Sequence, residues 1–152
     1  MKFPIKNTLS ILLVSALTFT ISESSLAQNS QQGELTKDRI ERLEESLAYG
    51  LSSEVSGVVK SALFNAISYK VEYPDFESDK VLNEVKVISE SHPSERVQSK
   101  AALVLNYYQN GADFPEQSTL LAELDNGNQD RIFDFLQRGI NSGQFTSTQE
   151  IN

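Results

Sequence analysis

The stretch Val97-Gln-Ser-Lys-Ala-Ala-Leu-Val-Leu-Asn-Tyr-Tyr108 decides the fold of this 152-residue chain, because its apolar residues recur at helical spacing. Apolar positions three or four residues apart lie on one face of an α-helix. Ser94 is a residue type that caps helix starts, and Asn110-Gly111 is typical of helix ends. The pattern predicts a helix over residues 94–109. Its buried face should hold Val97, Ala101, Val104, Leu105 and Tyr108.

An earlier stretch, from Val58 to Tyr69, repeats this pattern. Sliding the chain by 39 residues superimposes four of its positions, and sliding it by 41 superimposes an aromatic–proline break. The superimposed pairs are Val58 on Val97, Ala62 on Ala101, Ala66 on Leu105, Tyr69 on Tyr108, and Tyr73-Pro74 on Phe114-Pro115. A unit of about forty residues is in the range of repeats built from helix pairs. The chain should therefore contain a duplicated helix pair.

The run Val97-Gln-Ser-Lys-Ala-Ala-Leu-Val-Leu resembles the second helix of HEAT-like repeats, and Val58-Val59-Lys60-Ser61-Ala62-Leu63 is a looser copy. The resemblance covers residues 38–110 better than 116–140, and both copies lack the aspartate and the proline usual in such repeats. It implies an all-α fold of three antiparallel helix hairpins stacked as a short right-handed α-solenoid. An irregular α-helical bundle is the alternative. In either fold, short side chains would let paired helices approach closely, at Ala62, Ala101 and Ala102.

Helical periodicity extends over the rest of the chain after residue 35. Helices are predicted from Thr36 to Gly50, from Ser53 or Glu54 to the Tyr73-Pro74 break, and from Ser78 or Asp79 to Ser91. A fifth should contain Leu120, Leu121 and Leu124, and a sixth should run from Ile132 to Ile140. No segment shows the sustained two-residue alternation of a strand, so the expected fold class is all-α.

The first 27 residues have the pattern of a secretory signal peptide. Lys2 and Lys6 precede an apolar run over residues 9–21, and Ser25-Leu26-Ala27 offers the small residues of a cleavage site. An uncleaved anchor is the alternative. The predicted organisation is a signal peptide over 1–27, a flexible leader over 28–35, a helical repeat domain over 36–141 and a polar tail over 142–152. The protein should therefore be exported, to the periplasm or outside the cell.

The charge and the absence of cysteine exclude several classes of partner and attachment. Removing Lys2, Lys6 and Glu23 with the signal peptide leaves 11 basic and 20 acidic residues, a net charge of −9. Such a chain lacks the basic surface that binds nucleic acid and is repelled by anionic lipid. No further segment of the sequence is long and apolar enough for membrane insertion after cleavage. Without cysteine, the domain has neither disulfides nor a lipid-anchored cysteine.

No residue pattern has the chemistry of a catalytic or metal site, so we expect neither enzymatic activity nor a cofactor. His92 is the single histidine and lies in a predicted turn. Asp75, Glu77 and Asp79 alternate like the start of a calcium loop, but Lys80 and Lys86 occupy the positions of its glycine and its bidentate acid. A second oxygen-rich turn also lacks the required spacing: Asp125, Asn126, Asn128 and Asp130.

The aromatic residues at helix ends are the remaining candidates for function. Adjacent Tyr107 and Tyr108 point about 100° apart on a helix, so burying one brings the other nearer the surface. Tyrosine is enriched in binding interfaces. The predicted contacts with a protein partner are Tyr73, Phe76 and Tyr107.

The HEAT-like resemblance implies an exported scaffold or adaptor that binds another protein. A structural bundle, or one that binds an apolar ligand in a cavity between the second and fourth helices, is an alternative. An accessory to an envelope enzyme is a further one. It would require Asp75, Glu77 or Asp79 to converge with another acid in a pocket.

Overall fold

The helical periodicity corresponds to a chain of α-helices in the computed structural model, which describes residues 36–145. The helices are α1 (Lys37–Leu51), α2 (Ser56–Glu72), α3 (Asp79–Ser91), α4 (Glu95–Gln109), α5 (Gln117–Glu123) and α6 (Asp130–Asn141), with a 3-10 turn η1 (Gly111–Asp113). The described residues contain no strand, so the all-α prediction is confirmed. None of these helices is long and apolar enough to cross a membrane. The predicted signal peptide and leader lie outside the described residues.

Local chemistry accounts for several of the helix boundaries. The Ser78 hydroxyl accepts a hydrogen bond from the Val81 amide at 3.2 Å, which satisfies a free donor in the first turn of α3. α2 ends immediately before Tyr73-Pro74, as the break predicts. Thr36 and Ser94 stand at the starts of α1 and α4, but their side chains make no capping hydrogen bond. The residue types therefore mark all these boundaries, and only Ser78 acts as a side-chain cap.

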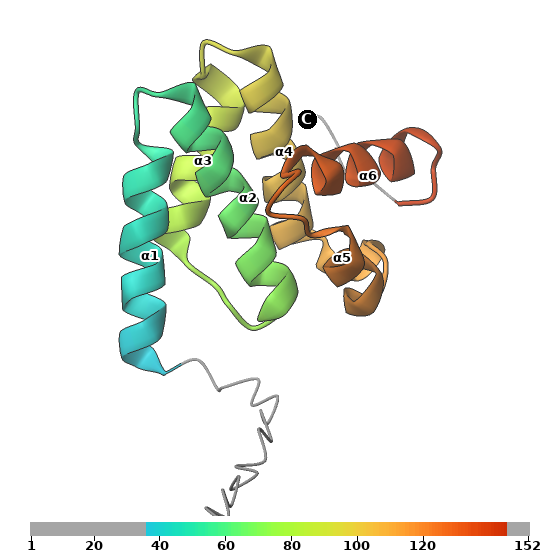
Figure 1. Ribbon diagram of the computed structural model, residues 1–152, viewed down its shortest axis with the longest axis horizontal. Coiled ribbons are helices and arrows are strands. Elements are labelled where there is room, and N and C mark those ends of the chain that lie inside the picture. The colour runs from blue at the N-terminus through green and yellow to red at the C-terminus, as the bar shows by residue number, and fades with distance from the viewer. Residues whose placement is uncertain (1–35, 146–152) are drawn as a thin grey trace, which may run out of the picture. The chain divides into compact units, whose positions relative to one another are not determined.

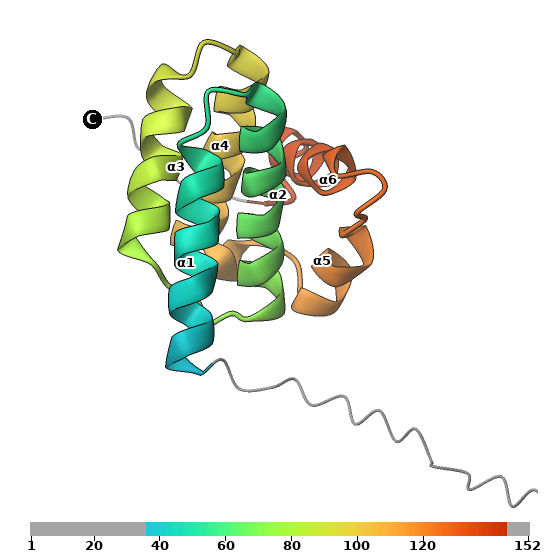
Figure 2. The same cartoon turned by 60° about the vertical axis from the view of Figure 1, so that its left-hand side comes forward.

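The first four helices form two antiparallel pairs that lie side by side. α1 packs on α2 and α3 packs on α4, while α1 also lies beside α3 and α2 beside α4 (Figure 1, Figure 2). Residues 73–78 return the chain from the end of α2 to the start of α3, so that α3 runs parallel to α1 (Figure 1). Two stacked hairpins and a four-helix bundle would both show these helix–helix contacts, so the first four helices do not distinguish between the two folds.

The third helix pair is placed differently from the first two. In a continued solenoid α5 would lie beside α3, whereas here α5 contacts α2 and α6 contacts α4 (Figure 1). α5 has only 7 residues, and the η1 turn precedes it, so it is too short to extend along a neighbouring helix. The solenoid arrangement of three hairpins is therefore not confirmed. The third pair instead covers one side of α2 and α4.

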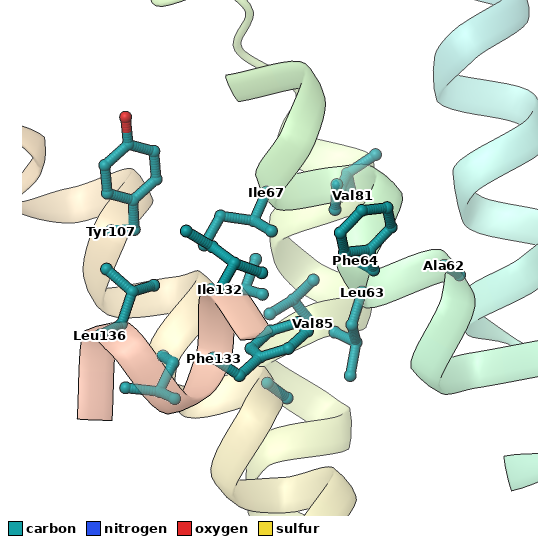
Figure 3. Close-up of a cluster of buried hydrophobic side chains, with 14 of the residues drawn as sticks. Ala62, Leu63, Phe64, Ile67, Val81, Val85, Tyr107, Ile132, Phe133 and Leu136 are labelled. Carbon is teal, nitrogen blue, oxygen red and sulfur yellow. The ribbon is translucent and has the colours of Figure 1, made fainter. Parts of the chain in front are cut away.

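One hydrophobic core joins all the helices. Figure 3 shows Ile132, Phe133 and Leu136 of α6 in the same cluster as Leu63 and Ile67 of α2. These α6 side chains are at most 3 % exposed. The last helix pair is therefore part of the core. Burial of each of these side chains contributes roughly 1.5–3 kcal/mol to the stability of the fold.

The burial of α2 and α4 differs at the first pair of the predicted repeat. Val58 is 42 % exposed, whereas Val97, its match in sequence, is 1 % exposed. Burial agrees at four positions when the two helices are compared with a shift of 38 residues in place of 39, although buried Leu103 then falls on exposed Asn65. The buried pairs are then Val59 with Val97, Ala62 with Lys100, Leu63 with Ala101, and Ala66 with Val104. Helical spacing therefore located both helices and most of the α4 face, where Val97, Ala101 and Val104 are buried, but the match of Val58 with Val97 did not predict burial.

Small residues do mark a close approach of two helices. A Cβ atom added to Gly50 of α1 would lie 2.8 Å from the Ala62 Cβ of α2, which is closer than such atoms pack. Ala62 is thus a contact point between paired helices, as predicted. Ala101 is fully buried in the core, but Ala102 is only half-buried.

The packed region extends past the predicted end of the domain at residue 141. Gly143 has a φ of 70°, and the Gly143 and Gln144 amides donate to the carbonyl oxygens of Ile140 and Gly139 at 3.0 and 2.9 Å. This pattern is a Schellman motif, in which a glycine adopts the left-handed conformation that ends a helix. It turns Phe145 back toward α6, where the ring is 9 % exposed. The rest of the predicted polar tail lies outside the described residues.

Candidate functional site

Phe76, one of the three predicted partner contacts, is a core residue. It is 1 % exposed, and its ring lies edge-on to Tyr69 with the centroids 6.5 Å apart. The loop between α2 and α3 folds this side chain inward, with the Phe76 amide donating to the Tyr73 carbonyl oxygen at 2.8 Å. A partner could not reach it in this structure, which corrects the prediction for this residue.

Tyr107 is also buried, at 8 % exposed. Its ring lies edge-on to Phe114 with the centroids 5.3 Å apart, and Figure 3 shows it beside Leu136. Its neighbour Tyr108 is half-buried and donates its hydroxyl to the Ala66 carbonyl oxygen at 3.0 Å. Burial raises the pKa of both tyrosines. Both rings therefore serve packing between helices, so Tyr107 is not the exposed contact that its position next to Tyr108 predicted.

Tyr73 is the predicted contact that remains at the surface. It is half-buried at the end of α2, and the Arg39 guanidinium lies 5.6 Å from its ring centroid. Arg39 Nη2 also donates to the Tyr73 hydroxyl at 3.2 Å. The residue thus fastens the start of α1 to the end of α2, and its role toward a partner stays a prediction.

The larger surface feature is the uncovered face of α2, which was not predicted. Its residues recur every three or four positions, so they form one stripe along the helix: Val58, Ser61, Asn65, Ser68 and Glu72. All are exposed or half-buried. The small polar residues Ser61, Asn65 and Ser68, which recur at helical spacing among apolar residues, were the signal in the sequence. We call this stripe and the two grooves beside it the α2 face.

One groove of the α2 face lies between α1 and α2 and has a volume of about 200 Å³. Gly50 and Ala62 line it where the two helices approach most closely. Val58 and Asn65 also line it, from α2, together with Ser46, Leu47, Ser61 and Tyr69. It is therefore a shallow groove with both apolar and polar walls.

The second groove lies between α2 and α5 and has a volume of about 400 Å³. Its apolar lining is Phe64, Leu121 and Leu124, and its polar lining is Asn65, Ser68, Tyr69, Glu72 and Asn126. Ser68 donates its hydroxyl to the Phe64 carbonyl oxygen at 2.8 Å, within α2. Glu72 is the single carboxylate of the lining, so the groove lacks the paired acids of general acid–base catalysis. Its lining combines amide, hydroxyl, carboxylate and apolar groups.

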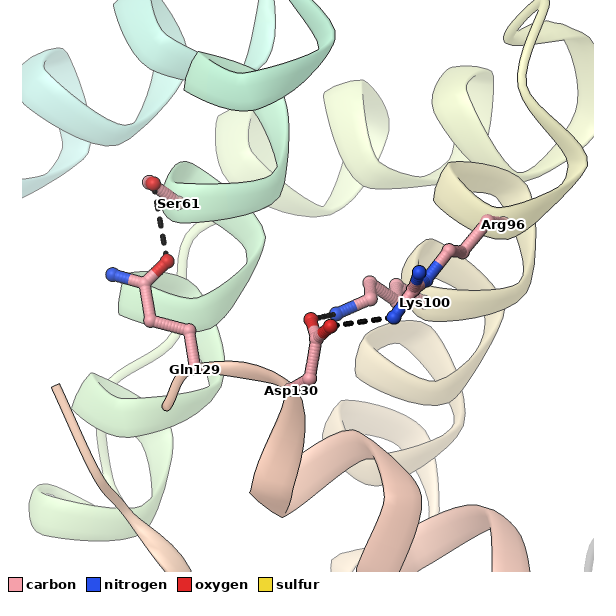
Figure 4. A network of polar contacts seen from close by, with 5 residues as sticks. All are labelled: Ser61, Arg96, Lys100, Gln129 and Asp130. Atoms are coloured by element: carbon pink, nitrogen blue, oxygen red, sulfur yellow. Dashed lines mark hydrogen bonds and ion pairs between the residues drawn. The ribbon is translucent and has the colours of Figure 1, made fainter. Parts of the chain in front are cut away.

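A polar cluster holds α6 against the helices that carry this face (Figure 4). Asp130, at the start of α6, pairs with Arg96 at 2.5 Å and with Lys100 of α4. The Lys100 side chain is 7 % exposed, and its Nζ lies 4.1 Å from the Phe133 ring centroid. Gln129 accepts a hydrogen bond from the Ser61 hydroxyl of α2 at 3.1 Å. These contacts position the third helix pair next to the α2 face.

The hydrogen bond from Lys100 lowers the pKa of Asp130. Partial burial opposes this effect, while the charges of Lys100, Arg96 and Lys60 add to it. A carboxyl whose pKa is lower in the folded state stabilises the fold above its unfolded pKa, and this contribution disappears as the pH falls through the folded value.

Asp130→Asn should lower the free energy of unfolding near neutral pH, because it removes the charge that pairs with Arg96 and Lys100. The expected loss is only about 1 kcal/mol, since Asp130 is partly exposed and solvent weakens its ion pairs. The difference from the parent chain should narrow as the pH falls below about 4, the ordinary range of an aspartate. Urea unfolding at several pH values measures the stability difference and its dependence on pH. Asp134→Asn is the control, since Asp134 is exposed on the same helix and has no ion pair within residues 36–145. A pH-independent difference would contradict the assigned role of the carboxylate.

The other candidate residues occupy turns and exposed positions. Asp75, Glu77 and Asp79 are exposed and do not converge in either groove. His92 Nδ1 accepts a hydrogen bond from the Ser94 amide at 3.0 Å, and Asp125 Oδ1 accepts one from the Gly127 amide at 2.8 Å. Within residues 36–145, no three histidine or carboxylate side chains are grouped so that they could hold a metal ion.

Comparison with known proteins does not assign the chain to a family. No protein-family model matches it, and neither a curated protein nor a solved structure is significantly similar to it. The proposals for its function therefore rest on the geometry of the described residues and on the sequence.

Proposed function

We propose that this protein is an exported scaffold or adaptor that binds another protein through the α2 face. The observation that carries the proposal is the uncovered stripe of α2, with a groove on either side of it. α2 packs against α1, α4 and α5, yet small polar residues keep its remaining face open. Export is proposed from the signal-peptide pattern of residues 1–27.

Binding is favoured over catalysis by the groups that line this face. Amides, hydroxyls and apolar side chains recognise a polypeptide through hydrogen bonds and packing, without a reactive group. Val58 and Leu121 add exposed apolar surface at 42 % and 39 %. The rigid core beneath α2 would hold these groups in fixed positions, which reduces the entropy lost on binding.

A photoreactive benzoylphenylalanine placed at Asn65 in the native host tests this function. Asn65 lines both grooves, so irradiation should yield a discrete cross-linked species whose partner is then identified by mass spectrometry. The control places the same residue at Asn83, which is exposed on α3 and lines neither groove. We expect cross-linking from position 65 at least about tenfold above that from position 83. Equal labelling from the two positions would count against the α2 face.

A further inference from the structure

We propose that the groove between α2 and α5 takes a basic side chain of the partner protein, with its aliphatic stem against α5 and its charge at Glu72. This inference rests on the proposed protein-binding function and names the chemistry that the groove would recognise. Three observations carry it: the apolar lining, the Glu72 carboxylate at the end of α2, which has no ion pair within residues 36–145, and the charge of the whole chain.

The apolar lining suits the stem of a long side chain. Phe64, which is 2 % exposed, lines the groove from α2, and Leu121 and Leu124 line it from the α5 side. A groove of about 400 Å³ has room for the four methylenes of a lysine or the three of an arginine. Lysine and arginine characteristically pack such stems on apolar surface while the charged end stays in contact with water.

The charge of the lining selects a cation. Glu72 is the single charged residue that lines the groove, and it forms no ion pair with any residue in the range 36–145. Lys70, two residues before Glu72 in the sequence, and Arg131 have other partners. Lys70 Nζ donates to the Pro74 carbonyl oxygen, and Arg131 pairs with Glu123 at 2.9 Å. The groove therefore retains a negative charge that a basic residue would neutralise.

Two amides add contacts beyond the charge. The side chains of Asn65 and Asn126 line the same groove and carry both hydrogen-bond donors and acceptors. They can bond to the peptide groups on either side of the bound residue. The chain as a whole carries a net charge of −8, which favours the approach of a basic partner.

Titration with short peptides, followed by NMR of the isotopically labelled exported chain, tests the proposal. The probes are acetylated and amidated Ala-Lys-Ala and Ala-Arg-Ala. Ala-norleucine-Ala retains the aliphatic stem but carries no charge. We expect saturable shifts of the Asn65 and Asn126 side-chain amides with the basic peptides, and about threefold to fivefold weaker binding of the norleucine peptide.

Two variants test whether Glu72 supplies the negative charge that binds the basic peptides. Glu72→Gln should weaken the basic peptides about threefold to fivefold and leave the norleucine peptide unchanged. Glu77→Gln is the matched control, because Glu77 is an exposed glutamate outside the groove lining and should have no effect. High salt should weaken the basic peptides alone.

Three results would overturn the inference: equal affinity for the lysine and norleucine peptides, an unchanged affinity in Glu72→Gln, or no saturable shift at about 20 mM peptide. Cross-linking from position 65 separates this inference from the proposed function. If that cross-link forms while the basic peptides fail to bind, the α2 face binds protein without a basic anchor. If both fail, the α2 face is not the binding surface.

Discussion

Replacing Phe76 with alanine should lower the free energy of unfolding by about 3 to 5 kcal/mol, the usual cost of truncating a fully buried phenylalanine. The ring is 1 % exposed and packs edge-on against Tyr69, so its removal would leave a cavity beneath the loop that joins α2 to α3. A domain of this size has a total stability of roughly 5 to 15 kcal/mol, so the loss would be a large share of it. Urea unfolding followed by circular dichroism measures the change.

Tyr49→Ala is the control for this experiment. Tyr49 is an aromatic residue that is 84 % exposed on α1, and its truncation should change the free energy of unfolding by less than about 0.5 kcal/mol. If Phe76→Ala instead cost less than Tyr49→Ala and abolished partner binding, Phe76 would be a contact residue, as its sequence position had predicted.

Gly139→Ala should destabilise the fold by about 2 to 4 kcal/mol, although alanine is the better helix former. A Cβ atom at this position would lie 1.7 Å from Cε2 of Phe145, a distance at which the ring must leave its place. Phe145 packs on Phe114 and Phe135 with centroids 5.7 Å away in each case, and those contacts would be lost. Thermal and urea unfolding measure the change.

A double-mutant cycle identifies the cause of this loss. In a Phe145→Ala background the clash is absent, and Gly139→Ala should then stabilise the chain by about 0.5 to 1 kcal/mol through helix propensity alone. A reversal of sign between the two backgrounds is therefore expected. The same destabilisation in both would place the cause elsewhere than in the Gly139–Phe145 contact.

The helices were predictable because their signals are local. Apolar spacing located all six, the Tyr73-Pro74 break marked the end of α2, and Ser78 was one of the two residues predicted to cap α3. Each of these signals depends on residues within a few positions of one another, so one sequence is enough to find them.

The candidate site was less predictable because exposure depends on distant residues. Tyr107 and Tyr108 have the same side chain on the same helix, and the position of Phe114 and of the Ala66 carbonyl determines how each is packed. Phe76 lies in a loop whose composition is polar, yet the loop folds it into the core. Residue type suggested an interface for Tyr107 and Phe76, whereas their burial assigns both rings to packing.

The sequence by itself determined the all-α class, the six helices and the close contact at Ala62, because spacing and side-chain size act over short distances. Only the tertiary structure decided that α5 packs on α2, that α6 is held to α4 by Asp130 and Lys100, and that α2 keeps one face open. These features come from contacts between residues about thirty or more positions apart, and helical periodicity carries no information on which apolar faces meet.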